Sequence, residues 1–323
     1  YQRFGDSVMD RVMPVPEALI GMRFDIAVSR MLGVSRSQAA AYIDRGQVSI
    51  ADRGSQRSAQ KSEKLVQGDS IEVAIAEDGD KPEPVDYGMR IVYEDDDLVI
   101  VDKPVGMAAH PSVGWTGPTV LGTLKARGVH ITEYGPQGRQ GIVSRLDAGT
   151  SGLMLVCKSE LAYKEMRRQF SEHEVTKIYY AVAQGSLKQD KATVDAPIGR
   201  DPVADFRFTI MPNGRPAITH WDVMERFGEA TYISVNLETG RTHQIRVHMS
   251  SIGHPLVGDT MYGANPVLAR GLGIGRQWLH SMKLEFKHPH TRLVVHVESE
   301  LPGDLSHSLE TLRARSRQQR QAV

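Results

Sequence analysis

Cysteine is nearly absent from the sequence: Cys157 is the only one among 323 residues. A single thiol excludes an intramolecular disulfide framework and a cysteine-built zinc site, so stability has to come from packing. Long apolar runs are missing too, because no stretch approaches the roughly 18 residues of a membrane span. Residues 1–16 also lack the apolar stretch of a signal peptide. We therefore expect a protein of the reducing cytoplasm with no membrane partner.

A net charge is missing as well, since 39 Lys and Arg residues balance 39 Asp and Glu residues. This balance argues against binding of nucleic acid through the net charge of the whole molecule. The distribution is uneven: nine acidic residues lie within 77–97, whereas residues 98–323 hold 27 basic and 21 acidic residues. The length exceeds the ~250–300 residues at which one hydrophobic core usually stops growing. We predict more than one domain, with an acidic linker over 77–90.

The N-terminal part predicts a small α/β domain over residues 16–76, preceded by an extension over 1–15. Apolar residues over 24–32 recur at the spacing of one face of a short helix. A second helix is predicted around residues 39–43. Short alternating segments predict strands over 47–50 and 71–75.

Residues 91–302 predict a larger domain of the α+β class. Apolar residues alternate with others around 180–182 and over 231–237, which is typical of antiparallel or mixed sheets with one buried face. Further predicted elements are strands over 98–101 and 152–156, a helix that begins after Thr119, and a helix over 161–170. The remaining residues, 303–323, form a basic tail that is expected to fray.

One polar turn combines an arginine and an aspartate in front of a buried strand. Arg145 and Asp147 flank Leu146, and the turn passes Gly149 before it enters the apolar run 152–156. This placement projects the carboxylate from a rigid edge toward a cleft. Two structural alternatives stay open for these residues alone: an aspartate bonded to its own turn backbone, or a surface ion pair worth at most about 1 kcal/mol.

Four ordered blocks of the sequence resemble the RluA-type pseudouridine synthases. The blocks are Val101-Asp102-Lys103-Pro104-Val105-Gly106-Met107, Ser144-Arg145-Leu146-Asp147 with Thr150-Ser151-Gly152, Lys177-Ile178-Tyr179-Tyr180-Ala181, and Arg241-Thr242-His243-Gln244-Ile245-Arg246 followed by Gly258-Asp259 and Tyr262-Gly263. The resemblance covers about residues 91–301. It implies the pseudouridine synthase fold, with a mixed, largely antiparallel sheet, and the isomerisation of uridine to pseudouridine in RNA.

The resemblance also implies roles for individual side chains. Asp147 matches the family's catalytic carboxylate, and Tyr179 matches a tyrosine that stacks on the displaced uracil. Arg246 is implied as the buried cation that holds the carboxylate ionised, on a helix that Thr242 can cap. Whether the carboxylate attacks the sugar, attacks the base or removes a ribose proton stays open. The implied contacts to RNA are Arg145, Arg241 and His243, with Leu279 as an apolar wall of the pocket.

Residues 16–76 resemble an S4-type RNA-binding domain. The resemblance rests on the runs Gly33-Val34-Ser35-Arg36-Ser37, Asp44-Arg45-Gly46-Gln47-Val48 and Gly68-Asp69. It implies that Arg36 and Arg45 contact RNA phosphates, and the structural alternative is a pair of solvated helix charges. Such a domain in front of the synthase blocks implies large-subunit, 23S-type ribosomal RNA or its precursor as the substrate.

Two features keep other functions open. Ser144 stands where the family usually has histidine, and the net charge is zero. Both fit a non-catalytic RNA-binding or ribosome-assembly factor on the same fold. A synthase specific for transfer RNA is a further alternative.

The histidines of the last block predict no metal site. His243 and His248 are five residues apart, which does not place two ligands on one helix face. The resemblance implies no cofactor, and we expect a monomer.

Overall fold

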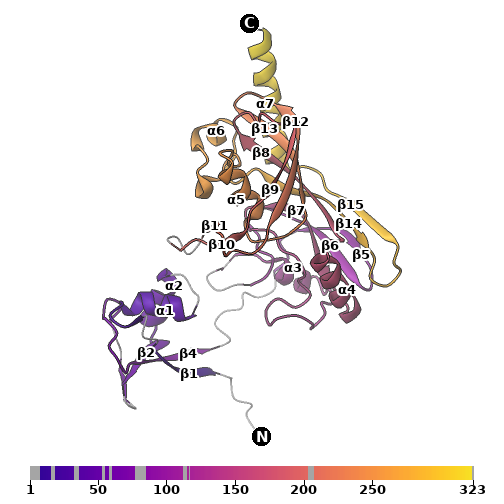
Figure 1. Ribbon diagram of the computed structural model, residues 1–323. Helices are drawn as coiled ribbons and strands as arrows, with labels where there is room; N and C mark the ends of the chain where they lie inside the picture. Colours follow the sequence, from indigo (N-terminus) through magenta and orange to yellow (C-terminus); the bar gives the residue numbers. More distant parts are fainter. Residues whose placement is uncertain are drawn as a thin grey trace. The chain divides into compact units, whose positions relative to one another are not determined.

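The chain divides into two compact units: residues 1–83 with 112–116 form the first, and residues 84–111 with 117–323 form the second (Figure 1). The computed structural model describes residues 8–15, 19–32, 36–52, 55–57, 60–76, 85–111, 115, 117–202 and 207–321. Within these ranges, no helix is both long and apolar enough to cross a membrane.

The first unit packs two short helices against a four-stranded antiparallel sheet. Its elements are β1 (Val8–Pro14), α1 (Phe24–Leu32), α2 (Arg36–Asp44), β2 (Val48–Asp52), β3 (Ser55–Arg57) and β4 (Ser70–Ala76). The strand order is β1-β4-β2-β3. Phe24, Ala27 and Val28 of α1 are fully buried and belong to one core with Ile50 and Ile71 of the sheet. The predicted helix face over 24–32 is therefore confirmed.

The prediction of an N-terminal extension over 1–15 is wrong for residues 8–14, which form strand β1. This strand pairs with β4 along its whole length, from Val8 opposite Ala76 to Pro14 opposite Ser70. An edge strand is held by backbone hydrogen bonds to one neighbour, so it needs no apolar run that a sequence pattern could reveal. Residues 33–35 of the S4-like run and residues 77–84 of the predicted linker lie outside the described residues.

The last acidic residues of the stretch 77–97 form a hairpin that begins where the predicted linker ends. Strand β5 (Arg90–Glu94) pairs antiparallel with β6 (Leu98–Lys103). An oxygen of Asp95 accepts the backbone N–H groups of Asp97 and Leu98, both at 2.8 Å. The Asp95 carboxylate stabilises a tight turn, and charge counting does not distinguish this structural use of an acidic residue from a solvated linker.

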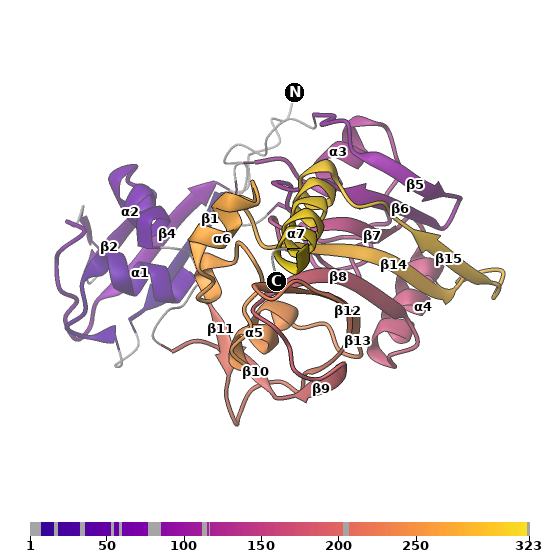
Figure 2. The same ribbon diagram turned by 90° about the horizontal axis from the view of Figure 1, so that it is seen from above.

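The second unit is built around a nine-stranded sheet. Besides β5 and β6, its strands are β7 (Ser151–Cys157), β8 (Thr176–Gln184), β9 (Lys191–Asp195), β12 (Ile218–Arg226), β13 (Ala230–Leu237), β14 (Leu279–Lys287) and β15 (Val294–Glu298). The order is β5-β6-β7-β14-β8-β13-β12-β9, with β15 paired to β14 (Figure 2). Among the described strands, neighbours are antiparallel except β7 and β14. The predicted α+β class with a mixed, largely antiparallel sheet is confirmed.

Helices cover both faces of this sheet. They are α3 (Val120–Ala126), α4 (Glu160–Ser171), α5 (Gln244–Ser251), α6 (Pro266–Gly271) and α7 (Gly303–Gln321), and a separate hairpin joins β10 (Ile198–Arg200) to β11 (Phe208–Ile210). Ile100 of β6 packs in the cluster of α4, and its neighbour Val101 packs in the cluster of α3. In β8, Tyr179 packs with α5, whereas Val182 packs with α7. Leu146 contacts the clusters of both α3 and α5, so these two helices share one face.

The prediction of a frayed basic tail over 303–323 is wrong, because residues 303–321 form helix α7. Leu305, Leu309 and Leu312 follow the spacing of one helix face and are buried in a cluster with Trp278. The indole N–H of Trp278 donates to Ser308 Oγ at 2.6 Å. The arginines of this segment masked its apolar stripe, and burial of that stripe opposes the fraying that is usual at a chain end.

Leu312→Ala is expected to lower the free energy of unfolding of the second unit by about 2–4 kcal/mol, because it removes a fully buried side chain. Urea unfolding followed by tryptophan fluorescence measures the loss, since Trp278 lies in the same cluster. Arg317→Ala, on the exposed side of the same helix, is the matched control, with an expected change below ~0.5 kcal/mol. Equal stability of wild type and Leu312→Ala would contradict a packed α7.

Candidate active site

The turn that carries Asp147 leads into β7. Gly152, near the beginning of this strand, fixes where the turn ends. Gly152 has a φ of +110°, and a Cβ at this position would lie 2.3 Å from the carbonyl oxygen of Ser281. Only glycine therefore allows β7 to approach β14 this closely. The backbone N–H of Thr150 donates to the Asp147 carbonyl at 3.0 Å, which closes the turn.

Arg276 ties the same turn to two other elements. Its Nη1 donates to the carbonyl oxygens of Gly149 and Leu279 at 3.3 and 3.2 Å. Its Nε and Nη2 bind both oxygens of Asp304, in the first turn of α7, at 2.7 and 3.1 Å. The arginine is 8% exposed and the Asp304 side chain is 35% exposed, so the bidentate pair is buried on the side of the arginine.

A buried lysine lies beside the turn. Lys103 is 0% exposed, and its Nζ donates to the carbonyl oxygens of Met107, Pro104 and Ala148 at 2.7, 3.0 and 3.4 Å. Burial lowers the pKa of Lys103 to about 7, against the opposing attraction of the Asp147 carboxylate. Lys103 belongs to the first sequence block, but no role was predicted for it from that block.

Arg246 of α5 connects two carboxylates. Its Nη1 donates to Asp147 Oδ2 at 3.0 Å, while Nε and Nη2 bind the two oxygens of Asp259 at 2.8 and 2.9 Å. The Tyr262 ring covers the guanidinium, with its centroid 4.9 Å from Cζ. Burial opposes the charge of Arg246, but Asp259 and Asp147 together raise its pKa above the usual value. The side chain of Asp147 is 25% exposed and that of Asp259 is 2% exposed, so solvent reaches this ion-pair network at Asp147.

Helix α5 begins without the predicted cap by Thr242. The N-cap residue is His243, which has a left-handed backbone with a φ of +56°, and no described side chain caps the helix there. Gln244 orders the approach instead, because its Oε1 accepts the backbone N–H of Arg241 at 2.9 Å. The Thr242 hydroxyl accepts from Nη2 of Arg145 at 3.1 Å, so it is engaged with the Asp147 turn.

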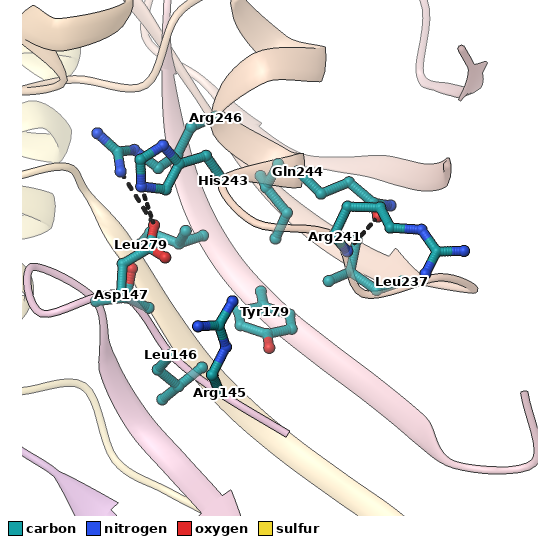
Figure 3. A pocket seen from close by; sticks show the side chains of 12 residues that line it. Arg145, Leu146, Asp147, Tyr179, Leu237, Arg241, His243, Gln244, Arg246 and Leu279 are labelled. Atoms are coloured by element: carbon teal, nitrogen blue, oxygen red, sulfur yellow. Dashed lines mark hydrogen bonds and ion pairs between the residues drawn. The ribbon is translucent and has the colours of Figure 1, made fainter. Parts of the chain in front are cut away.

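Asp147 and Arg246 line one open pocket (Figure 3). Its lining comprises Arg145, Leu146, Asp147, Thr150, Tyr179, Leu237, Arg241, His243, Gln244, Ile245, Arg246 and Leu279. The lining mixes apolar walls with a few convergent polar groups, as ligand-binding pockets do. Tyr179 and Leu279 come from the neighbouring strands β8 and β14. Burial raises the pKa of Tyr179 to about 12, and the Asp147 charge acts in the same direction.

The predicted site residues divide between the two units. Asp147, Tyr179, Arg246, Arg145, Arg241, His243 and Leu279 all line this pocket. Arg36 and Arg45 belong to the first unit, where Arg36 Nε donates to Asp25 at 2.9 Å and Arg45 is exposed. Sequence reasoning missed the roles of Asp259 and Tyr262. Both stand in the last block, but nothing in the sequence shows that the chain folds back onto Arg246 after α5.

The histidines of the last block do not converge. His248 binds the Thr219 hydroxyl and the Ala196 carbonyl at 2.8 and 2.9 Å, and His254 binds the Gln184 carbonyl at 2.7 Å. In the described part of the chain, no three His, Cys, Asp or Glu side chains are grouped to hold a metal ion.

Comparison with known proteins agrees with this architecture. Residues 97–251 match the family model of RNA pseudouridylate synthases. An RNA pseudouridine synthase of Mycobacterium bovis, named as uncharacterized, is 49% identical over 307 residues, which cover 94% of this chain and 98% of the relative. Ribosomal large subunit pseudouridine synthase D of Nitrosomonas europaea is 39% identical over 309 residues, covering 93% and 87%. The solved structure of human RNA pseudouridylate synthase domain containing 1 matches with a TM-score of 0.53 and 27% identity, over 70% of this chain and 95% of that one.

Fold and sequence likeness over most of the chain define the class as an RNA-modifying isomerase. The chain belongs to the RNA pseudouridine synthase family, and its relatives named synthase D agree with the RluA type that the four blocks predicted.

Lys103→Met is expected to change how stability depends on pH. The pKa of Lys103 is about 7 in the folded protein and 10.5 as its ordinary value, so between these values the unfolded state binds one proton more than the folded state. Stability then rises with pH, and wild type should gain about 2 kcal/mol relative to Lys103→Met between pH 7 and pH 9. Urea titrations of both proteins at the two pH values measure this difference. Parallel pH profiles would show that the folded protein does not depress this pKa.

Proposed function

We propose that this RNA pseudouridine synthase isomerises specific uridines of large-subunit ribosomal RNA or its precursor, with Asp147 as the catalytic carboxylate. The observation that carries the proposal is the ion pair of 3.0 Å between Asp147 and Arg246, in a pocket that Tyr179 also lines. The substrate is supported by relatives named ribosomal large subunit pseudouridine synthase D, at 39% identity from Nitrosomonas europaea and 37% from Pseudomonas aeruginosa.

Isomerisation breaks the bond between ribose C1′ and uracil N1, turns the base and joins C1′ to C5. C5 then loses its proton and N1 gains one, so that the product is an isomer of uridine. The target base first leaves the RNA stack, at a cost of a few kcal/mol. Asp147 then acts at the sugar, at the base or on a ribose proton, and all three routes need the carboxylate form. Arg246 supports that form with a guanidinium that keeps its proton, and Asp259 holds the guanidinium in line.

Tyr179 and Leu279 give the detached base a surface on which to turn. With a pKa of about 12, the Tyr179 phenol stays protonated at neutral pH, so it offers a hydrogen-bond donor beside an aromatic face for stacking. Leu279 adds an apolar wall from the neighbouring strand. This surface excludes water from one side of the pocket, where the cleaved base is open to side reactions.

The RNA is held by local cations rather than by net charge. Arg145 and Arg241 line the pocket and are proposed to bind phosphates beside the flipped nucleotide. The first unit is proposed as an S4-like RNA-binding domain, with Arg36 and Arg45 on RNA phosphates. Its two helices on a small antiparallel sheet support this assignment. The cytoplasmic location and the monomeric state stay predictions.

Asp147→Asn is expected to lower pseudouridine formation by a factor on the order of 10⁴, because it removes the reacting carboxylate. The assay incubates the protein with unmodified large-subunit ribosomal RNA transcripts and maps pseudouridine by chemical labelling. RNA affinity should stay within about threefold of wild type, because the substitution keeps the size of the side chain. Asp222→Asn, an exposed aspartate of β12, is the matched control.

The same assay separates the alternatives. Wild-type product on transfer RNA alone would favour a transfer-RNA-specific synthase. Tight binding of ribosomal RNA without product would favour a non-catalytic assembly factor. Full turnover by Asp147→Asn would remove Asp147 from the mechanism.

Arg45→Ala is expected to weaken binding of a ribosomal RNA fragment several-fold at low salt. It should also reduce the slope of log affinity against log salt by about 0.9, which is the loss expected for one phosphate contact. Arg45 is exposed, so folding should be unaffected. Arg30→Ala, an exposed arginine on α1, is the control, and filter binding at several salt concentrations gives both slopes. An unchanged slope for Arg45→Ala would leave this arginine as a solvated helix charge.

A further inference from the structure

His243 occupies a position that its sequence block did not predict. Its side chain is 15% exposed, and Nε2 lies 3.7 Å from Oδ2 of Asp147, the same oxygen that Arg246 binds. On the other side of the ring, Nδ1 lies 2.7 Å from the Tyr262 hydroxyl. Figure 3 shows the imidazole and the guanidinium reaching Asp147 together. His243 therefore bridges Tyr262 and Asp147, whereas a contact to an RNA phosphate would favour an exposed ring.

The hydrogen bonds around Tyr262 assign the proton on this imidazole. The backbone N–H of Phe208 donates to the Tyr262 oxygen at 3.0 Å. The phenol's own proton then points to Nδ1 of His243, which accepts it. The ring proton consequently lies on Nε2 and faces Asp147. This tautomer also avoids placing a bare nitrogen lone pair against a carboxylate oxygen.

The surroundings keep the imidazole neutral. Burial has the largest effect and lowers the pKa of His243, and the charges of Arg246 and Arg145 act in the same direction, against Asp147 and Asp259. A neutral imidazole adds a hydrogen-bond donor to Asp147 without adding a second positive charge. The left-handed backbone of His243 is a strained conformation for a residue other than glycine, and such strain persists where the surrounding structure enforces it.

We propose that His243 is a positioning residue: its Nε2–H and the Arg246 guanidinium both hold Oδ2 of Asp147, which leaves Oδ1 as the oxygen that reacts with the nucleotide. Among the described residues, the side chains that reach this carboxylate do so at Oδ2. The distance of 3.7 Å is longer than a hydrogen bond, and such contacts commonly tighten when substrate binds. This inference rests on the proposed catalytic role of Asp147.

His243→Met and His243→Gln separate hydrogen bonding from packing. Both replacements are unbranched and similar in length, and both bear the cost of the left-handed backbone, but only glutamine has an N–H group near the position of Nε2. We expect His243→Met to lower kcat on large-subunit RNA transcripts about tenfold, because Asp147 loses one of its two donors. KM should stay within about twofold, because the RNA contacts are retained. His243→Gln should recover most of the lost kcat.

Parallel assays of wild type and Asp147→Asn keep the two proposals apart. An active wild type and an inactive Asp147→Asn uphold the catalytic role of Asp147 whatever the His243 variants do. Within that result, a wild-type kcat for His243→Met, equal losses for both His243 variants, or a change in KM alone overturns the positioning role. A change in KM alone would place His243 on the RNA. An inactive wild type, or a fully active Asp147→Asn, overturns the proposed function and this inference with it.

A spectroscopic measurement covers the case in which a His243 substitution disturbs folding. In full-length wild-type protein with ¹⁵N-labelled histidine, the His243 ring should carry its proton on Nε2 at neutral pH. Tyr262→Phe keeps the ring over Arg246 but removes the hydroxyl, so it should abolish this preference. A proton on Nδ1, or a doubly protonated ring, in the wild-type protein overturns the proposal.

Discussion

The candidate active site depends on the Arg246 guanidinium, which binds two carboxylates at once. Arg246 binds Asp147, 99 residues before it in the chain, and Asp259, 13 residues after it. Removing one partner from a buried ion pair typically costs 3–5 kcal/mol, because the other charge stays buried without compensation. The three groups are therefore placed by folding itself, before any substrate binds. Fixed charges of this kind act on a reacting group without the reorganisation that water would need.

The nine-stranded sheet separates the pocket, which lies on the face with α5, from the apolar cluster on the face with α7. Side chains alternate along β8, so Tyr179 faces α5 and the pocket while Val182 faces α7 on the opposite side. Buried cations on the pocket side are compensated locally: carbonyl oxygens surround Lys103, and carboxylates surround Arg246. The apolar cluster under α7 needs no such compensation. One twisted sheet thus supports the pocket on one face and the apolar cluster under α7 on the other.

The sequence could predict what depends on local periodicity and on ordered motifs. The helix over 24–32 and the α+β class follow from apolar spacing, and the four blocks alone place Asp147, Tyr179 and Arg246 in one predicted site. Strand β1 was not predicted, because backbone pairing at a sheet edge leaves no signal in the composition. Helix α7 was not predicted, because four arginines obscured its stripe of leucines. The role of Asp259 and the orientation of His243 were not predicted for a different reason. They depend on how the chain returns through the short 3₁₀ turn Thr260–Tyr262 and on a single left-handed residue, which tertiary packing decides.

Arg276 forms a brace between the carbonyl of Gly149 and the carboxylate of Asp304. This brace limits where an affinity tag or a fluorescent protein can be fused to this enzyme. Asp304, at the beginning of α7, holds the arginine whose Nη1 supports the Gly149 carbonyl two residues beyond Asp147. The far end of the same helix, over residues 317–321, is exposed. A carboxy-terminal fusion leaves the brace intact when it extends the helix from that exposed end. Trimming the chain back past Asp304 to shorten the fusion would leave Arg276 without its carboxylate partner beside the turn that carries Asp147.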